Sequence, residues 1–294
     1  ALGLFLAIGG FGGMGMGPAI QASINAYGWR HTFLFISLLV LVFAIIVPAI
    51  FIRNRPEEVG QVSDGAQGLD DTADTRKPMP IKAAYKTPVD FTAKEAMRTR
   101  CFWLLVVYYS MNMLAMNAVM VPQMPHLNDI GVNNIVGAFA LSIMVGVMSF
   151  SQFGTGFIGM KFSMHSIAIC AEIIKAIGLI ILVTTRSLPF VFVYMVCLGL
   201  GFGAFIVAMM NILPNYFGAK YYPKIMGNAR LFFAIIGSAG APIAGHIKDI
   251  TDSFIPAFQG AVVIIIVGII FLALAKPPVH PSLRKSHQTN SPTV

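Results

Sequence analysis

Long uninterrupted apolar runs are the feature that most limits how this chain can fold. About 20 helical residues are needed to cross the roughly 30 Å hydrocarbon core of a bilayer. Lipid offers the backbone no hydrogen bonds, so such runs are expected to be helices, and none of them alternates polar and apolar residues as a barrel strand would. The sequence therefore predicts an all-α polytopic membrane protein with eight visible transmembrane helices. They lie near residues 1–26, 32–52, 102–124, 134–160, 166–184, 189–212, 229–247 and 256–275.

The composition agrees with lipid as the solvent for most of the chain. Of its 294 residues, 56% are apolar and only 11% are charged, whereas a soluble domain carries about 25% charged residues. The chain begins at Ala1, already inside an apolar run, and lacks the basic start of a signal peptide. We therefore expect it to be an N-terminally truncated part of a longer protein.

The net charge of +8 indicates membrane topology rather than nucleic-acid binding. The basic residues lie at the ends of the apolar runs, not along one face or among stacking aromatics. If residues 54–101 are cytoplasmic, parity places 16 of the 20 Lys and Arg residues inside and three outside, as the positive-inside rule predicts. We expect a cytoplasmic central loop and C-terminus, with the lipid bilayer and not nucleic acid as partner.

One long polar stretch separates two apolar runs before it from six after it. Its first part is acidic and Gly-rich, and its second part ends in the basic sequence TAKEAMRTRCFW, which predicts a short amphipathic helix at the membrane surface. Four parts are predicted. They are two helices of an N-terminal half in 1–53, a cytoplasmic loop in 54–101, a six-helix bundle in 102–276 and a cytoplasmic tail in 277–294.

Cysteine and histidine usage indicates no metal site and no cofactor. Cys101, Cys170 and Cys197 lie in or beside apolar runs, where cysteine is commonly a small apolar residue. The six histidines are not paired with one another. His126, near Asp129, could titrate close to neutral pH, although a solvated loop position is the commoner case.

Two other classes of function remain as alternatives to transport. A polytopic enzyme would need a nucleophile with a base, paired acids or an H-E-x-x-H motif at membrane depth. None of these is present, and no catalytic residue is predicted. A sensor would need a folded signalling domain, for which the stretch 54–100 is too polar and Gly-rich.

Glycines recur at spacings that let two helices approach closely. In the first run Gly9, Gly13 and Gly17 share one helical face, and Pro18 follows, which removes a backbone hydrogen bond and bends the helix. Two further close-packing sets are predicted, and plain helix packing without gating is the alternative for each. They are Gly199 with Gly203, and Gly237 with Ala241, Pro242 and Gly245.

Several short motifs, taken in their order, resemble the major facilitator superfamily. Gly13 to Pro18 is similar to the G-x-x-x-G-P motif of that family's fifth helix, and Gly28-Trp29-Arg30 to the GWR that opens its sixth. The remaining matches are the loops after the sixth helix and between the tenth and eleventh, and the start of the seventh. They lie at Arg53 to Gly60, at Tyr216 to Gly227 and at Arg100 to Trp103.

The resemblance implies a fold and a function. It implies helices five to twelve of a twelve-helix transporter that works by alternating access and is functional as a monomer of the full-length chain. The Trp103 context and the Pro-Glu-Glu loop look most like bacterial monocarboxylate and oxalate/formate antiporters. A small organic anion, exchanged or carried with protons across a bacterial inner membrane, is the substrate class that this implies.

One family motif is degraded in this sequence. The loop after the eighth helix usually reads G-x-x-x-D-R/K, but here Met160 stands where the acid is expected and Lys161 follows. A cytoplasmic gating latch in this half would therefore rest on Lys161 and Arg230 with other partners.

The resemblance also implies which polar residues line the central cavity. The first helix of each three-helix repeat lines it in this family. Tyr108, Asn112 and Asn117 of the seventh helix and Asn211 of the tenth are therefore the substrate-binding candidates, with Gln123 at the end of the seventh. Interhelical hydrogen bonds without ligand contact are the alternative reading.

Glu172 and Lys175 form the one candidate ion pair inside a span. They lie three residues apart, close enough to pair across one helical turn. Either charge alone would cost about 2.5 to 3.5 kcal/mol at the centre of a span. Because the ninth helix is peripheral in the family, a structural pair is favoured over a proton or substrate relay.

Overall fold

The structure is a computed structural model that describes residues 2–51, 85, 87–185 and 187–278. The side chains of residues 2–15, 17, 18, 21 and 51 are outside the description. All regular structure in the described ranges is helical, which confirms the predicted all-α class. The chain divides into two compact units, one of residues 1–15 with 81–294 and one of residues 16–80.

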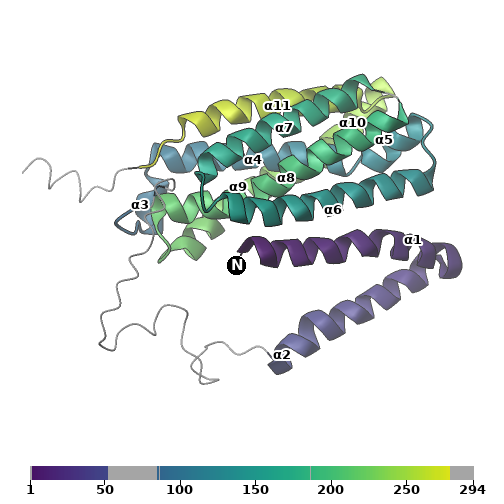
Figure 1. Cartoon of the computed structure of the whole chain (residues 1–294), viewed down its shortest axis with the longest axis horizontal. Helices are drawn as coiled ribbons and strands as arrows, with labels where there is room; N and C mark the ends of the chain where they lie inside the picture. The colour runs from purple at the N-terminus through teal and green to yellow at the C-terminus, as the bar shows by residue number, and fades with distance from the viewer. Residues whose placement is uncertain (1, 52–84, 86, 186, 279–294) are drawn as a thin grey trace, which may run out of the picture. The chain divides into compact units, whose positions relative to one another are not determined.

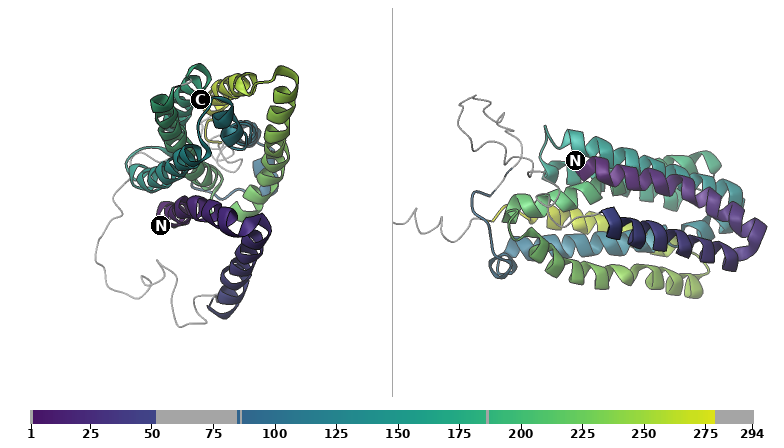
Figure 2. Two further views of the ribbon diagram at one scale, coloured as in Figure 1. Left: turned by 90° about the vertical axis from the view of Figure 1, so that its right-hand side faces the viewer. Right: turned by 90° about the horizontal axis from the view of Figure 1, so that it is seen from below.

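Six membrane-length helical segments follow the polar stretch and run side by side in Figure 1, and the left view of Figure 2 looks along them. Two short helices, α3 (Ala93–Met97) and α5 (Gln123–Asp129), lie before and after the first of them. The six segments are α4 (Arg100–Met120), α6 (Asn134–Ile158), α7 (Met164–Thr184), α8 (Leu188–Phe217), α9 (Tyr222–Ser238) with α10 (Gly240–Thr251), and α11 (Ile255–Leu274).

Successive segments alternate in direction, so their ends gather in two places. The starts of α4, α7 and α9 and the ends of α6, α8 and α11 lie at one end, which we call the α3 end because α3 is there (Figure 1). The opposite end contains α5 and is called the α5 end. The helices pack mainly as α8 against α6 and α7, and as α4 against α9 and α11.

Local sequence signals explain where these helices begin. Thr92 and Glu95 form a capping box on α3, and the Thr99 side chain accepts a hydrogen bond from the Phe102 amide at the start of α4. Asn133 and Ser163 cap α6 and α7 in the same way. Proline opens α8, α9 and α11, where its missing N–H costs nothing.

Glycines allow two close helix contacts in the bundle. An added methyl group would lie 2.6 Å from the Met144 carbonyl oxygen at Gly199 and 2.4 Å from the Met148 oxygen at Gly203. This confirms the predicted packing pair, whose partner is α6. In the other predicted set, Gly237 approaches Met113 of α4. Gly245 has no neighbour within 4 Å, so that part of the prediction is wrong.

The N-terminal helices precede the polar stretch in the chain. Helix α1 (Leu2–Val40) contains a break at Gly28, whose φ of 77° interrupts the helical backbone. A π-helical stretch (Leu41–Ile46) and α2 (Val47–Phe51) continue it. Among the described residues seven helices are long and apolar enough to cross a membrane, one of them Ala22–Ile50. The first predicted span, 1–26, is not among these seven, and most of its side chains are outside the description.

Candidate functional site

A polar layer divides the apolar core of the six-helix bundle at its middle. One apolar cluster near the α3 end includes Tyr109 and Phe205, and the other, toward the α5 end, includes Ala115 and Phe202. The layer consists of Tyr108 and Asn112 from α4 and Glu172 and Lys175 from α7. These residues lie near the centres of their helices, so in a bilayer the layer would lie near the midplane.

An ion pair forms the centre of this layer. The Lys175 ammonium nitrogen lies 2.9 Å from both carboxylate oxygens of Glu172, and both side chains are fully buried. Their charges cancel, which offsets part of the cost of burying them. Only Oε1 of Glu172 accepts a hydrogen bond, and Oε2 has no hydrogen-bond partner among the described residues. Oε2 is therefore held by the ion pair with Lys175 alone.

Helix α4 supplies the remaining polar contacts of the pair. The Tyr108 hydroxyl donates to Glu172 Oε1 at 2.7 Å, and the Lys175 ammonium donates to the Asn112 side-chain oxygen. The Asn112 amide donates to the Tyr108 carbonyl at 3.2 Å, one turn earlier. A spacing of four residues brings Tyr108 and Asn112 onto one face of α4. Both ends of the ion pair are thereby tied to α4.

Helix α8 shapes the space around Lys175. Its ammonium lies 4.4 Å from the ring centre of Phe205 and 5.2 Å from that of Phe202, both in α8, within cation–π range. Gly201 directly precedes Phe202 in α8, and an added methyl group there would lie 2.2 Å from the Lys175 side chain. The sequence thus leaves room for the lysine stem where α7 meets α8.

The four substrate-binding candidates occupy different places. Tyr108 and Asn112 are about 1% exposed and join the ion pair, so no ligand reaches them in this structure. Asn117 donates to the Gly237 carbonyl at 2.9 Å and links α4 to α9. Asn211 bonds within its own helix, to the Val207 carbonyl at 2.7 Å. Gln123 is fully buried, and its amide has no hydrogen-bond partner among the described residues.

The gating candidates Lys161 and Arg230 have no described contacts that would form a latch. Lys161 follows α6 and Arg230 lies on α9, both exposed, and neither forms an ion pair within the described residues. Gly13, Gly17 and Pro18 lie in α1, but their packing surroundings are outside the description. Their close packing remains a prediction.

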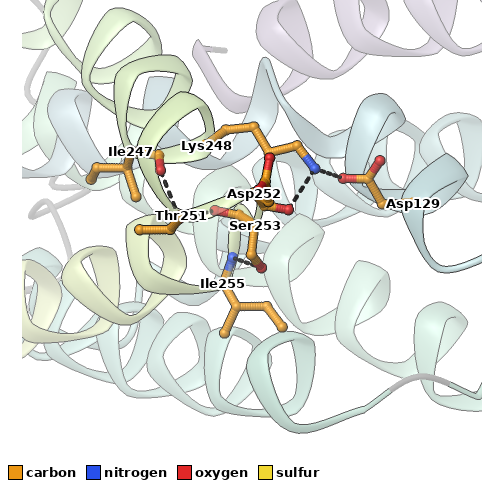
Figure 3. A network of polar contacts seen from close by, with 7 residues as sticks. All are labelled: Asp129, Ile247, Lys248, Thr251, Asp252, Ser253 and Ile255. Carbon is orange, nitrogen blue, oxygen red and sulfur yellow. Dashed lines mark hydrogen bonds and ion pairs between the residues drawn. The ribbon is translucent and has the colours of Figure 1, made fainter.

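A second polar network, which sequence reasoning missed, lies at the α5 end (Figure 3). Lys248 of α10 donates to the Asp129 carboxylate at 2.5 Å and to the Asp252 carbonyl at 2.9 Å. Asp252 has a left-handed conformation, with φ of 54°, that ends α10. The network ties the end of α5 to the turn between α10 and α11. The only sequence signal for this network was the opposite charges of Asp129 and Lys248, which lie in two predicted loops.

His126 lies beside this network and corrects an expectation. A solvated loop histidine was expected, but the side chain is only 4% exposed. Its ring stands edge-on against Phe258 of α11, with ring centres 5.0 Å apart. Burial lowers the pKa of His126, opposed by nearby Asp129 and reinforced by Lys248. The imidazole is therefore neutral at pH 7.

The lowered pKa of His126 predicts that acid destabilises the bundle. Because the folded-state pKa lies below the unfolded value of about 6.5, the unfolded state binds the proton more readily. The contribution of His126 to stability is then complete above pH 6.5 and falls as the pH decreases. We expect His126→Asn to show a shallower loss of thermal stability between neutral and acidic pH than the unchanged chain. Identical pH profiles in detergent would contradict the burial argument.

Comparisons with known proteins agree with this architecture. The family model described as Major Facilitator Superfamily matches residues 1–163 and 105–294. "Monocarboxylate transporter 2" of Rattus norvegicus is 22% identical over 268 residues, which cover 88% of this chain and 53% of that protein. The Homo sapiens protein of the same name is 20% identical over 267 residues, which cover 88% of this chain and 55% of that protein.

The chain thus spans about half the length of the curated relatives it matches. The family match, by contrast, extends over all of it, in two overlapping segments. The helical bundle, the membrane-length segments and the matched model lead to one conclusion. The chain belongs to the major facilitator superfamily and is related to the monocarboxylate transporters.

Proposed function

We propose that this chain is part of a secondary transporter that moves a small organic anion, such as a monocarboxylate, by alternating access. The observation that carries the proposal is the neutral Glu172–Lys175 pair, fully buried in the middle of the bundle. An intramembrane ionisable group is by default a functional candidate. The names of the two relatives support the substrate class. Transport rather than an enzymatic or sensory role is the function that the family supports.

The pair suggests how proton and anion movement are coupled. In the structure Glu172 neutralises Lys175, so no charge is left for a substrate carboxylate. A proton on Glu172 Oε2, which is held only by its ion pair with Lys175, would release the ammonium, and an organic anion would take the place of the carboxylate. One proton and one monovalent anion would then enter together, leaving the net charge of the buried layer unchanged. Exchange of two anions needs a proton that stays on Glu172 throughout, while one anion replaces the other at Lys175.

Other polar residues are assigned supporting roles in the proposal. Tyr108 and Asn112 orient the pair, and opening between α4 and α7 would expose them to substrate. Asn117 and Asn211, both half-buried, are further contacts. Gly13, Gly17 and Pro18 with Lys161 and Arg230 take part in packing or gating. The proposed protein works as a monomer of its full length, with 54–101 and the C-terminus in the cytoplasm, in a bacterial inner membrane.

A purely structural ion pair is the competing role for Glu172 and Lys175, and one variant distinguishes the two. Glu172→Gln/Lys175→Met removes both charges while keeping similar side-chain volumes and a hydrogen-bond acceptor for Tyr108. We expect this variant to fold but to lose monocarboxylate transport by about 100-fold or more, since one buried charge contact contributes roughly that much. Normal uptake by the folded variant would show that the pair is structural.

The substrate class is tested in proteoliposomes that contain the complete transporter of which this chain is proposed to be a part. Counterflow of labelled monocarboxylates is compared with that of a labelled dicarboxylate, a cation and a neutral sugar. We expect saturable counterflow of the monocarboxylate. Uptake of the cation or the sugar without anion counterflow would remove the proposed substrate class and leave the fold assignment intact.

A further inference from the structure

A large cavity lies at the α3 end of the bundle, away from the buried ion pair. Its volume is about 1100 Å³. It is bounded by α3, by the first turns of α4 and by the end of α11 with the residues that follow, and Figure 1 shows these elements at the same end of the bundle. No residue of the Tyr108, Asn112, Glu172 and Lys175 layer lines it. It is therefore a separate site.

The cavity wall has two chemical faces. Leu104 and Leu274 supply an apolar surface, with the fully buried Phe91 also in the wall, while Arg98, Arg100 and Lys276 supply three cations, all from exposed residues. Among the described residues of the wall the single acid is Glu95, whose carboxylate accepts hydrogen bonds from the Thr92 amide and hydroxyl. The wall thus carries an excess of positive charge beside an apolar floor. An amphiphilic anion matches both faces.

The position of the cavity along the helices indicates the depth at which it would lie in a membrane. Helix α4 has 21 residues and α11 has 20, each about 30 Å long and enough to cross the hydrocarbon core. Arg100 begins α4 and Leu274 ends α11, so the cavity lies where the core gives way to headgroups. The half-exposed Trp103 ring donates to the Met97 carbonyl at 2.8 Å at this level, as expected of an interfacial tryptophan.

From these observations we infer that the cavity binds the headgroup of an anionic phospholipid. Its phosphate would lie among Arg98, Arg100 and Lys276, and an acyl chain would follow Leu104 and Leu274 toward the hydrocarbon core. Basic pockets at the ends of transmembrane helices commonly bind such headgroups. A bound lipid would join α3 to the ends of α4 and α11, because the three cations come from those three places.

The inference is tested by binding of phosphatidylglycerol to the purified chain in neutral detergent, with phosphatidylcholine as the uncharged comparison. The test variant is Arg98→Gln/Arg100→Gln/Lys276→Gln. The control variant, Lys94→Gln/Lys220→Gln/Lys224→Gln, removes the same charge from exposed residues at the same end that do not line the cavity. We expect about 100-fold weaker phosphatidylglycerol binding by the test variant, since each cation contributes about fivefold.

The control variant should bind within about threefold of the unchanged chain, since it retains all three cavity cations. Equal losses in the two variants, or normal binding by the test variant, would overturn the inference. If the triple variant fails to fold, Lys276→Gln alone should weaken binding about fivefold, and no change would likewise contradict it. Displacement of phosphatidylglycerol by inorganic phosphate or a free monocarboxylate would identify a soluble anion, not a lipid, as the occupant.

Discussion

Replacing Glu172 with alanine is expected to destabilise the six-helix bundle by about 3–5 kcal/mol, the cost of leaving a buried charge without its partner. Lys175 is fully buried, and Glu172 is its only anionic contact in the part of the chain that the structure describes. The remaining groups around its ammonium are the Asn112 oxygen and two phenylalanine rings, which do not cancel a full charge. Unfolding of the detergent-solubilised chain by sodium dodecyl sulfate measures the effect.

The double variant Glu172→Gln/Lys175→Met is the control for this prediction. It removes both charges, so no unpaired ion remains, and most of the lost stability should return. The single change Glu172→Gln should fall between the two, because the amide still accepts from Tyr108 but does not neutralise Lys175. If Glu172→Ala lowers the free energy of unfolding no more than the double variant does, the pair does not have the energetic role that its burial indicates.

Replacing Gly203 with leucine is the second change with a large expected effect. A methyl group added at this position would lie 2.4 Å from the Met148 carbonyl oxygen and 2.7 Å from the Ser151 β-carbon, both in α6. Backbone atoms cannot rotate aside as a long side chain can, so α6 and α8 must separate. Overpacking of this kind costs about 1–3 kcal/mol and occasionally more. The expected result is a clearly lowered unfolding midpoint.

Gly154 of α6 supplies the matched control for Gly203. It lies in one of the same two helices, and an added methyl group there has no neighbour within 4 Å. Gly154→Leu should therefore leave stability within about 0.5 kcal/mol of the unchanged chain. Similar losses for the two leucine variants would mean that helix propensity or membrane insertion, not close approach of α8 to α6, sets the cost.

Sequence reasoning predicted the helices well because lipid leaves the backbone few choices. The apolar runs 134–160 and 166–184 correspond to α6 and α7 with small shifts at their ends. The span predicted at 229–247 begins seven residues earlier, at Tyr222, because Pro223 favours the first turn of a helix there. It is also broken between α9 and α10 at Ala239. Hydropathy cannot locate such a break.

The contacts of the site could be predicted only in part. The three-residue spacing of Glu172 and Lys175 indicated a pair within one helix turn. Their links to Tyr108 and Asn112, 64 and 63 residues away in the chain, depend on how α4 packs against its neighbours. The same holds for Lys248 and Asp129, 119 residues apart. His126 was misjudged because only the tertiary fold brings Phe258 over its ring.

Proton movement driven by a monocarboxylate gradient tests the central proposal most directly. Proteoliposomes with the complete protein and an internal pH-sensitive dye are given an external monocarboxylate. The account predicts rapid internal acidification as proton and anion enter together through the Glu172–Lys175 site. It also predicts that the folded Glu172→Gln/Lys175→Met variant shows no acidification above empty liposomes. Equal acidification by the two proteins would contradict the account, because coupling would then not pass through the buried pair.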